Sequence, residues 1–222
     1  MSEALHCPLC SHPAGARRKQ PWHRDRRREY WRCPECRLVF VPPAWHLTAV
    51  REKAEYDLHQ NRVDDPAYRR FLSRLAGPLL ARLPAARSGL DFGCGPGPAL
   101  AAMLEEAGHA VSLYDIFYCR DENVWLACYD FIVSTEVVEH LYLPGHELQR
   151  LWQHLHPGGW LGIMTRLVRD REAFAGWHYK NDPTHVCFFS RDTWQWWAAR
   201  QGAELEFVAD DALLLRKLPQ QQ

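Results

Sequence analysis

The sequence predicts an α/β fold, a doubly wound and mostly parallel sheet, preceded by a small cysteine-rich module. An apolar strand runs into a glycine-rich turn at residues 90–97, Leu-Asp-Phe-Gly-Cys-Gly-Pro-Gly. Helical spacing of apolar residues at 99–108 follows, and then come short apolar strands at 110–114, 130–134 and 160–164 with a helix at 148–155. Strands that alternate with helices of this length are typical of parallel sheets.

The glycine-rich turn predicts a ligand at the carboxyl end of the first strand. Gly93, Gly95 and Gly97 permit backbone conformations that a side chain would forbid, so a ligand can lie against bare peptide. Asp115 follows the next strand, about 20 residues after the turn, where a carboxylate can accept hydrogen bonds from ribose hydroxyls. These positions favour a nucleoside-containing cofactor.

Asp91 narrows the choice of cofactor. The spacing Gly-x-Gly-x-Gly differs from the dinucleotide turn, and a carboxylate two residues before the first glycine would repel a pyrophosphate. The same carboxylate would attract an ammonium group. S-adenosylmethionine (SAM) carries an ammonium group together with a cationic sulfonium, so the residues favour SAM.

Four segments resemble the successive motifs of class I SAM-dependent methyltransferases: residues 91–97, Asp115, residues 129–134 and residues 155–162. The resemblance covers about the last 135 residues and implies a Rossmann-like, seven-stranded sheet. Glu136-Val-Val-Glu-His140 is similar to the branch with the ubiquinone-biosynthesis O-methyltransferases and the small-RNA 3′-end 2′-O-methyltransferases. The cofactor residues implied are Asp91, Phe92, Gly93, Cys94, Gly95, Gly97, Asp115, Ile116, Ser134 and Thr135.

One segment departs from the family pattern. Residues 116–129 are too few for the usual helix and third strand at normal length. That strand usually supplies an acidic residue that contacts the adenine. Asp121 and Glu122 are the two alternatives that the sequence offers for this contact.

The cysteines at the amino-terminal end predict a structural zinc site. Cys7-Pro-Leu-Cys10 and Cys33-Pro-Glu-Cys36 are separated by 22 residues, a spacing that can place four thiolates tetrahedrally around one Zn²⁺. Strand-like sequence around them indicates a zinc ribbon over residues 1–42 that needs its metal to fold. A helical linker or lid over 43–86 and a methyltransferase domain over 87–222 complete the predicted division.

The residues after strand 130–134 border the predicted reaction site. If a helix begins there, Glu136, Glu139 and His140 share one face, and His185 from a later loop could join them. Such a set suits Mg²⁺, Mn²⁺ or Zn²⁺, which would lower the pKa of an attacking hydroxyl. In the metal-free alternative His185, or else His140 or His178, acts as general base.

Aromatic side chains outside these motifs are candidates for pocket walls. Helical spacing at 47–58 and 67–83 predicts two helices in the linker, which carry Tyr56 and Tyr68. Trp177 to Tyr179 could line an aromatic substrate pocket. Trp194 and Trp197 share a helix face and are expected in the core.

Composition limits the partners. The 222 residues have a formal net charge of +0, which argues against attraction of the whole molecule to nucleic acid. Basic residues nevertheless crowd one stretch, which could bind RNA, an anionic substrate, or only solvent: Arg17, Arg18, Lys19, Arg24, Arg26, Arg27, Arg28 and Arg32. With no leader and no long apolar run, a soluble cytoplasmic protein without membrane contact is expected, and no partner protein is evident.

Three functional hypotheses follow. The first is a SAM-dependent methyltransferase that transfers a methyl group to a hydroxyl of a small metabolite. The second keeps the chemistry and makes RNA the substrate, bound through the basic ribbon. The third is a catalytically silent SAM-binding or interaction module, which the short segment 116–129 would favour.

Overall fold

The computed structural model describes residues 5–14, 20–58 and 62–219. The elements before the main sheet are β1 (His23–Arg24), β2 (Glu29–Arg32), β3 (Val39–Phe40), α1 (Ala49–Tyr56) and α2 (Pro66–Leu80). Then come β4 (Ser88–Phe92), α3 (Ala99–Glu106), β5 (Ala110–Tyr114), η2 (Glu122–Leu126), β6 (Tyr129–Thr135), α4 (Pro144–Gln153) and β7 (Leu155–Met164). The last are α5 (Arg171–Ala175), η3 (His178–Asn181), β8 (Cys187–Phe188), α6 (Arg191–Gln201), β9 (Glu204–Phe207) and β10 (Ala212–Arg216), and η1 (Pro43–Trp45) precedes α1.

The main sheet is the predicted Rossmann-like sheet. Its order is β5-β4-β6-β7-β10-β9, with parallel pairing from β5 to β7 and antiparallel pairing of β10 with both of its neighbours. The carboxyl ends of β4, β5 and β6 lie side by side, because Phe92 pairs with Tyr114 and Asp91 pairs with Val133. The predicted ligand turn therefore lies at one edge of three adjacent strands.

Within the described residues this sheet has six strands, one fewer than the seven predicted. The missing strand is the third of the family pattern. Between β5 and β6 the chain forms only a small loop, closed by a bridge from Asp115 to Cys119, and then the 3-10 helix η2. The segment is too short for a helix and a strand, so β5 forms the edge of the sheet.

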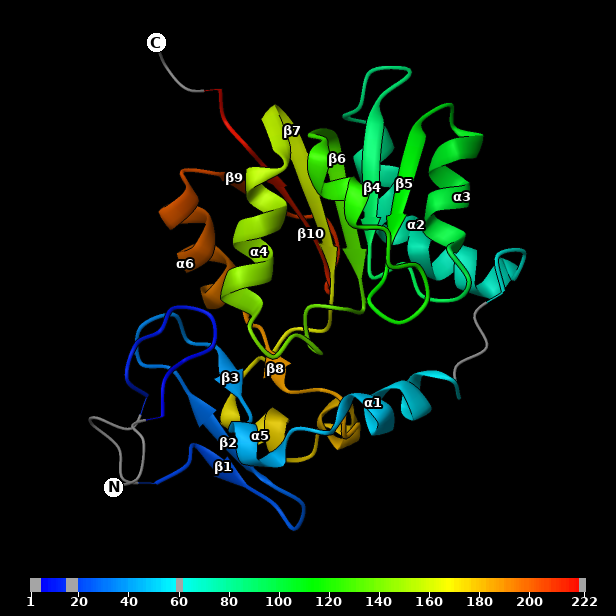
Figure 1. Cartoon of the computed structure of the whole chain (residues 1–222). Helices are drawn as coiled ribbons and strands as arrows, with labels where there is room; N and C mark the ends of the chain where they lie inside the picture. The colour runs from blue at the N-terminus through cyan, green and yellow to red at the C-terminus, as the bar shows by residue number, and fades with distance from the viewer. Residues whose placement is uncertain (1–4, 15–19, 59–61, 220–222) are drawn as a thin grey trace.

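Helices cover both faces of the sheet (Figure 1). On one face α2 and α3 bury Leu72, Leu75 and Leu100 against Phe131 and Val133. On the other face the buried side chains of α4 and α6 join the sheet in a second core: Leu148, Leu151, Trp152, Trp194 and Trp197 with Ile132, Leu161 and Ile163. The expectation that Trp194 and Trp197 are core residues is confirmed. None of the described helices is long and apolar enough to span a bilayer.

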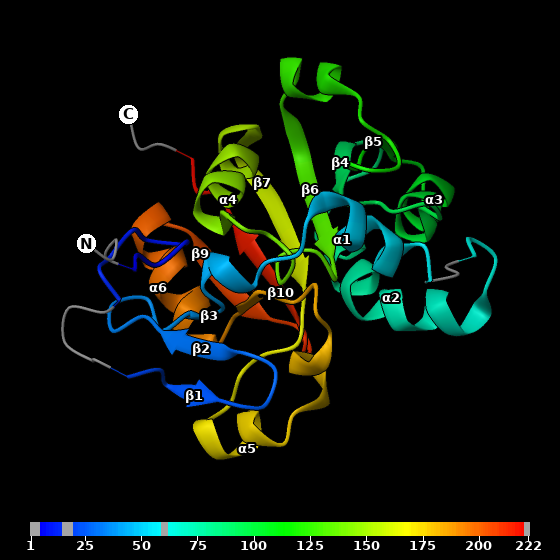
Figure 2. The ribbon, with the colours of Figure 1, turned by 60° about the horizontal axis from the view of Figure 1, so that its bottom comes forward.

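The amino-terminal module has a small sheet of its own, which a later segment completes. Its order is β1-β2-β3-β8, and β8 enters from residues 187–188 to pair with β3. Figure 2 shows this sheet beside the carboxyl-end edge of the main sheet, with α1 between the module and α2. Tyr30 is fully buried in the core shared with the sheet, and its ring contacts those of Phe174 and Phe188. The module is thus continuous with the rest of the fold.

Candidate functional site

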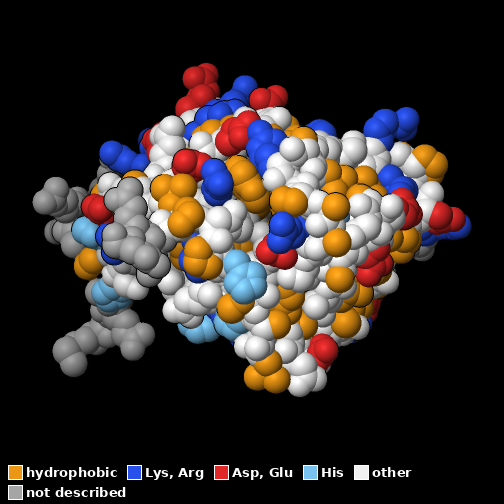
Figure 3. Space-filling model, turned by 90° about the horizontal axis from the view of Figure 1, so that it is seen from above, with side chains coloured by type: hydrophobic (Ala, Val, Ile, Leu, Met, Phe, Trp, Pro, Cys, Tyr) orange, Lys and Arg blue, Asp and Glu red, His pale blue; other side chains and the backbone are white. Residues whose placement is uncertain are grey.

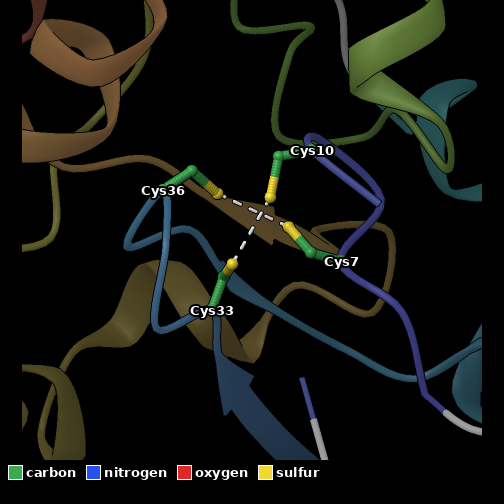
Figure 4. Close-up of side chains that lie close together, drawn as sticks. All are labelled: Cys7, Cys10, Cys33 and Cys36. Carbon is green, nitrogen blue, oxygen red and sulfur yellow. Dashed lines mark hydrogen bonds between the residues drawn. The ribbon is translucent and has the colours of Figure 1, made fainter. Parts of the chain in front are cut away.

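Four sulfur atoms converge in the amino-terminal module (Figure 4). The Sγ atoms of Cys7 and Cys36 lie 3.5 Å apart, as do those of Cys10 and Cys33, and all four lie within 4.8 Å of one another. A zinc ion bound tetrahedrally at about 2.3 Å from each sulfur would place the sulfurs about 3.8 Å apart. The four thiols therefore fit Zn²⁺, as the spacing predicts.

The two halves of this cluster share one backbone geometry. In the first half the Cys7 N–H donates to His12 O and the Ser11 N–H donates to Cys7 O. The second half repeats both bonds, from Cys33 to Leu38 and from Arg37 to Cys33. Ser11 and Arg37, each directly after a knuckle, have the positive φ values 60° and 65°. Two similar turns of this kind can each present a pair of thiols to one shared metal ion.

The predicted cofactor residues gather at the carboxyl ends of β4, β5 and β6. Gly93 and Gly95 have φ values of 78° and 62°, which glycine adopts freely. A Cβ on Gly93 would collide with Val137, whereas one on Gly95 would meet open space. The turn is therefore tight against the protein at Gly93 and open toward a ligand at Gly95.

Two carboxylates lie beside the turn. Asp91 is buried, and burial, partly offset by a backbone hydrogen bond from Ala101, raises its pKa to about 7. Asp115 accepts hydrogen bonds from the backbone of Gly95 at 3.0 Å and of Phe117 at 2.8 Å, so it ties the glycine turn to its own loop. Ile116, the next residue, is 59% exposed. A cationic ligand would relieve the unfavourable burial of Asp91.

The two predicted alternatives for an adenine contact have other partners. Asp121 accepts hydrogen bonds from Asn123 and caps η2. Glu122 forms ion pairs with Arg120 at 3.0 Å and Arg150 at 3.5 Å. These hydrogen bonds and ion pairs of Asp121 and Glu122 are thus made with residues outside the glycine turn.

The helix expected at Glu136 does not form. Residues 136–140 make a turn in which Glu136 has a φ of 53° and the His140 N–H donates to Val137 O. The next helix, α4, begins at Pro144, and a proline disfavours helical backbone in the residue before it. The backbone of this turn forms hydrogen bonds with another segment instead, because Glu139 O accepts from the N–H groups of both Val186 and Cys187.

The turn still brings together most of the predicted catalytic set. One ligand atom each from Glu139, His140 and His185 lie within 4.8 Å of one another. The rings of His140 and His185 are 4.6 Å apart. Glu136, the fourth predicted ligand, is not part of this group of three.

The orientation of His185 is fixed by its neighbours. Its Nδ1 lies 2.7 Å from Tyr179 O, and since a carbonyl only accepts, Nδ1 carries the proton. In the neutral ring Nε2 then carries the lone pair, and it lies 3.8 Å from a carboxylate oxygen of Asp182. Burial opposes ionisation of Asp182, but the hydrogen bonds from Thr184, together with the charge of His185 when that ring is protonated, lower the pKa of Asp182. A lone pair on Nε2 is what a general base or a metal ligand needs.

Tyr179 was expected only as a pocket wall, yet its hydroxyl donates to Glu139. Glu139 is fully buried, and burial raises its pKa even though His185 and Tyr179 oppose the rise. Burial and the neighbouring Glu139 raise the pKa of Glu136 to about 8. One carboxylate oxygen of each glutamate, like the hydroxyl of Ser134, is buried without a hydrogen-bond partner. Three buried polar atoms thus lie at and just after the end of β6 without a hydrogen-bond partner.

Helix α1 packs against this site. Tyr56 packs its ring 5.1 Å from that of His140 and 5.7 Å from that of Phe117. Tyr118 donates a hydrogen bond to Asp57 at the end of the helix. Tyr68 on α2 is half-buried, and burial together with Asp91 raises its pKa to about 12.

Among the described residues of the basic stretch, Arg28 is buried, whereas Arg24, Arg26 and Arg27 are exposed. Arg28 is 6% exposed, Arg24 pairs with Glu29, and Arg32 lies 3.7 Å from Asp192. Arg17, Arg18 and Lys19 lie outside the described residues. Figure 3 shows the opposite end of the molecule, the top in Figure 1, where basic and acidic side chains are interspersed.

Comparison with known proteins now identifies the family. A family model described as "Methyltransferase domain" matches residues 59–207, which is more than half of the chain. The chain belongs to this methyltransferase family. A search of curated proteins gives no match.

Solved structures of other methyltransferases share the fold. The 1,6-didemethyltoxoflavin-N1-methyltransferase of Burkholderia thailandensis, with bound S-adenosylhomocysteine, matches with a TM-score of 0.53 and 17% identity, over 82% of this chain and 96% of that one. Streptomyces venezuelae DesVI matches with a TM-score of 0.52 and 16% identity, over 78% of this chain and 100% of that one. Human N-acetylserotonin methyltransferase, in complex with SAM, matches with a TM-score of 0.51 and 16% identity, over 76% of this chain and 57% of that one. The six-stranded sheet is thus the sheet of class I, SAM-dependent methyltransferases, with one strand lost.

Proposed function

We propose that this methyltransferase binds SAM at the glycine turn and methylates a hydroxyl group of a small, partly aromatic metabolite. The observation that carries the proposal is the shared location of two features. The turn at Gly95 and the group of Glu139, His140 and His185 both follow strands, β4 and β6, that are neighbours in the sheet. A methyl donor on the turn would face an acid–base group one strand away.

SAM, when bound, supplies a methyl group on a cationic sulfonium. Asp91 would hold the ammonium group, and the bare backbone at Gly95 lets the cofactor approach. His185, with its proton fixed on Nδ1, would accept the proton of the acceptor hydroxyl at Nε2. The rings of Tyr56 and Tyr179 would exclude water from the transfer.

A divalent cation at Glu139, His140 and His185 is the second form of this proposal. One carboxylate and two imidazoles suit Zn²⁺ or Mn²⁺ better than Mg²⁺, which prefers oxygen ligands. Glu139 supports this form, because one of its carboxylate oxygens has no hydrogen-bond partner. In that form the three residues would hold the cation, which would supply Lewis-acid stabilisation of the acceptor's oxyanion.

A small substrate is favoured over RNA by the internal pairing of basic residues in the ribbon. Arg24 pairs with Glu29, and Arg28 donates to carbonyl oxygens of residues 180–183, so neither side chain is free to bind phosphates. The oxygens left at the end of β6 accept hydrogen bonds, so they match hydroxyl or amine donors.

The experiment is transfer of a labelled methyl group from SAM to a panel of catechols, phenols, hydroxylated heterocycles and total RNA. His185→Gln should lower the rate on the true acceptor at least about 100-fold, as loss of a general base does. His156→Gln, an exposed histidine outside the site, should leave the rate within about twofold. Labelling of RNA alone would overturn the proposed substrate class, and equal rates in both variants would overturn the role of His185.

A further inference from the structure

The zinc ribbon and the loop that carries His185 are joined at three places. The first is β8, which begins two residues after His185 and pairs with β3, so that Phe40 faces Cys187. The second is Val186, whose carbonyl accepts from Val41 and whose N–H donates to Glu139 O. One short segment thus links the ribbon on one side to the turn of Glu139 on the other.

Arg28 makes the third and most extensive junction. Its guanidinium donates to the carbonyl oxygens of Lys180 at 2.7 Å, Asp182 at 2.7 Å and Pro183 at 3.1 Å. These carbonyls lie at and just after the end of η3, where helical backbone leaves acceptors without partners. Its Nε donates to the Tyr30 hydroxyl at 3.1 Å, which holds the guanidinium in place.

Two neighbours of Arg28 hold the same loop. Arg27 donates to Asn181 O at 2.6 Å. Asp25 pairs with Lys180 at 2.6 Å, and Lys180 is 5% exposed. Burial opposes ionisation of Asp25, but the hydrogen bonds from Lys180 and the backbone hold its pKa below the usual value.

We propose that Arg28 is a positioning residue for His185: the zinc ribbon holds residues 178–185 in the one conformation in which Tyr179 O accepts a hydrogen bond from Nδ1–H and Nε2 faces the site. This inference rests on the proposed function of His185. It makes the ribbon a part of the active site that never touches the substrate. It also gives the basic stretch a role that requires neither RNA nor solvent exposure.

The test is the tautomer of His185 at one fixed pH, read from ¹⁵N ring signals of the full chain loaded with one equivalent of zinc. His185→Gln assigns the signals. In the unaltered protein and in the matched control Arg26→Ala, an exposed arginine of the same turn, the Nδ1–H form should dominate. In Arg28→Ala the excess of the Nδ1–H form should disappear, and Arg28→Lys should restore only part of it.

Zinc content and the thermal midpoint of each variant show whether it has folded. If Arg28→Ala does not fold, Arg27→Ala and Lys180→Met, which remove single contacts with this loop, should each shift the tautomer in the same direction. A folded Arg28→Ala protein that keeps the Nδ1–H form overturns the proposal. Unfolding of Arg28→Ala combined with an unchanged tautomer in both other variants overturns it as well.

Titration of SAM into the same samples keeps this inference apart from the proposed function. Arg28→Ala should bind SAM within about twofold of the unaltered protein, since Arg28 contacts only the loop and the ribbon. Absence of SAM binding in the unaltered protein would count against the proposed function and leave the tautomer result standing. A loss of SAM binding in Arg28→Ala alone, at least tenfold, would show general damage and overturn the specific positioning role.

Discussion

At the scale of single residues, the glycine turn offers a matched pair of substitutions. Gly95 and Gly108 both have positive φ values, 62° and 89°, and both have open space where a Cβ would lie. Each change to alanine should destabilise the fold by about 1–2 kcal/mol. Only Gly95→Ala should also weaken SAM binding, by at least about tenfold, because only Gly95 lies on the proposed cofactor surface.

Calorimetric titration of SAM into both variants checks this prediction. Equal affinities in Gly95→Ala and Gly108→Ala would mean that the cofactor does not lie against this turn.

Asp91 predicts a pH dependence. Its pKa of about 7 in the folded protein, against an ordinary value of 3.8, means that folding favours its protonated form. The stability from this group is present in full below about pH 4 and is lost as pH rises through 7. The stability of Asp91→Asn relative to the unaltered protein should therefore increase between pH 4 and 7, by up to about 4 kcal/mol.

Urea unfolding of both proteins without ligand, at several pH values, measures this difference. Parallel curves would show that Asp91 is ionised in the empty protein. If its ionised form holds the ammonium group of SAM, SAM affinity should rise with pH up to about 7, and Asp91→Asn should lose that rise.

How far single residues could be predicted depends on how local their roles are. The four cysteines, Asp91 and the glycines follow from spacing within one turn or one strand. Tyr179 and Arg28 could not be assigned in this way, because their partners Glu139 and Lys180 lie 40 and 152 residues away in the chain. A buried arginine in a basic stretch has the same sequence signal as an exposed one.

At the scale of elements, the zinc ribbon should depend on its metal. Loss of zinc would free four thiols and leave β3 without support, so its pairing with β8 should be lost too. Cys33→Ser should lose the zinc and lower the melting temperature by at least about 10 °C, given that structural zinc contributes on the order of 10 kcal/mol. Cys128→Ser, an exposed thiol outside the cluster, should change neither.

Metal analysis and thermal unfolding test this prediction. An unchanged melting temperature in Cys33→Ser would show that the ribbon folds on its apolar contacts alone.

Elements were predicted well where one periodic pattern controls them. The strands β4 to β6 and helices α1 to α3 fall close to the predicted ranges, whereas α4 begins at Pro144 instead of residue 148 and β7 at Leu155 instead of residue 160. The helix at Glu136 was wrong, because the pattern of Glu136, Glu139 and His140 says nothing of Pro144 or of the bonds from residues 186–187. The short segment 116–129 predicted that the usual helix and third strand would not both fit, and the described structure has no strand there.

At the scale of the whole molecule, the predicted division into ribbon, linker and catalytic domain separates parts that pack together: the ribbon joins the core on one face of the sheet, and α2 of the linker joins the core on the other face. Phe174 and Phe188 pack against Tyr30 of the ribbon, and β8 belongs to the ribbon sheet. The full chain should therefore unfold in one transition, with calorimetric and van't Hoff enthalpies that agree. Removal of residues 1–42 should expose the edge of β8 and yield aggregated protein.

Scanning calorimetry of the full chain and solubility of the truncated chain test this cooperativity. Two separate transitions, together with a soluble chain lacking residues 1–42, would show that the ribbon is an independent domain.

The most direct test of the central claim is calorimetric titration of SAM and of its demethylated product into the zinc-loaded protein, repeated with Asp115→Ala. We predict micromolar binding of both ligands, weakened at least about tenfold in Asp115→Ala, because Asp115 holds the loop beside Gly95. No binding to the unaltered protein would contradict the account. It would mean that a sheet without its third strand no longer holds the cofactor.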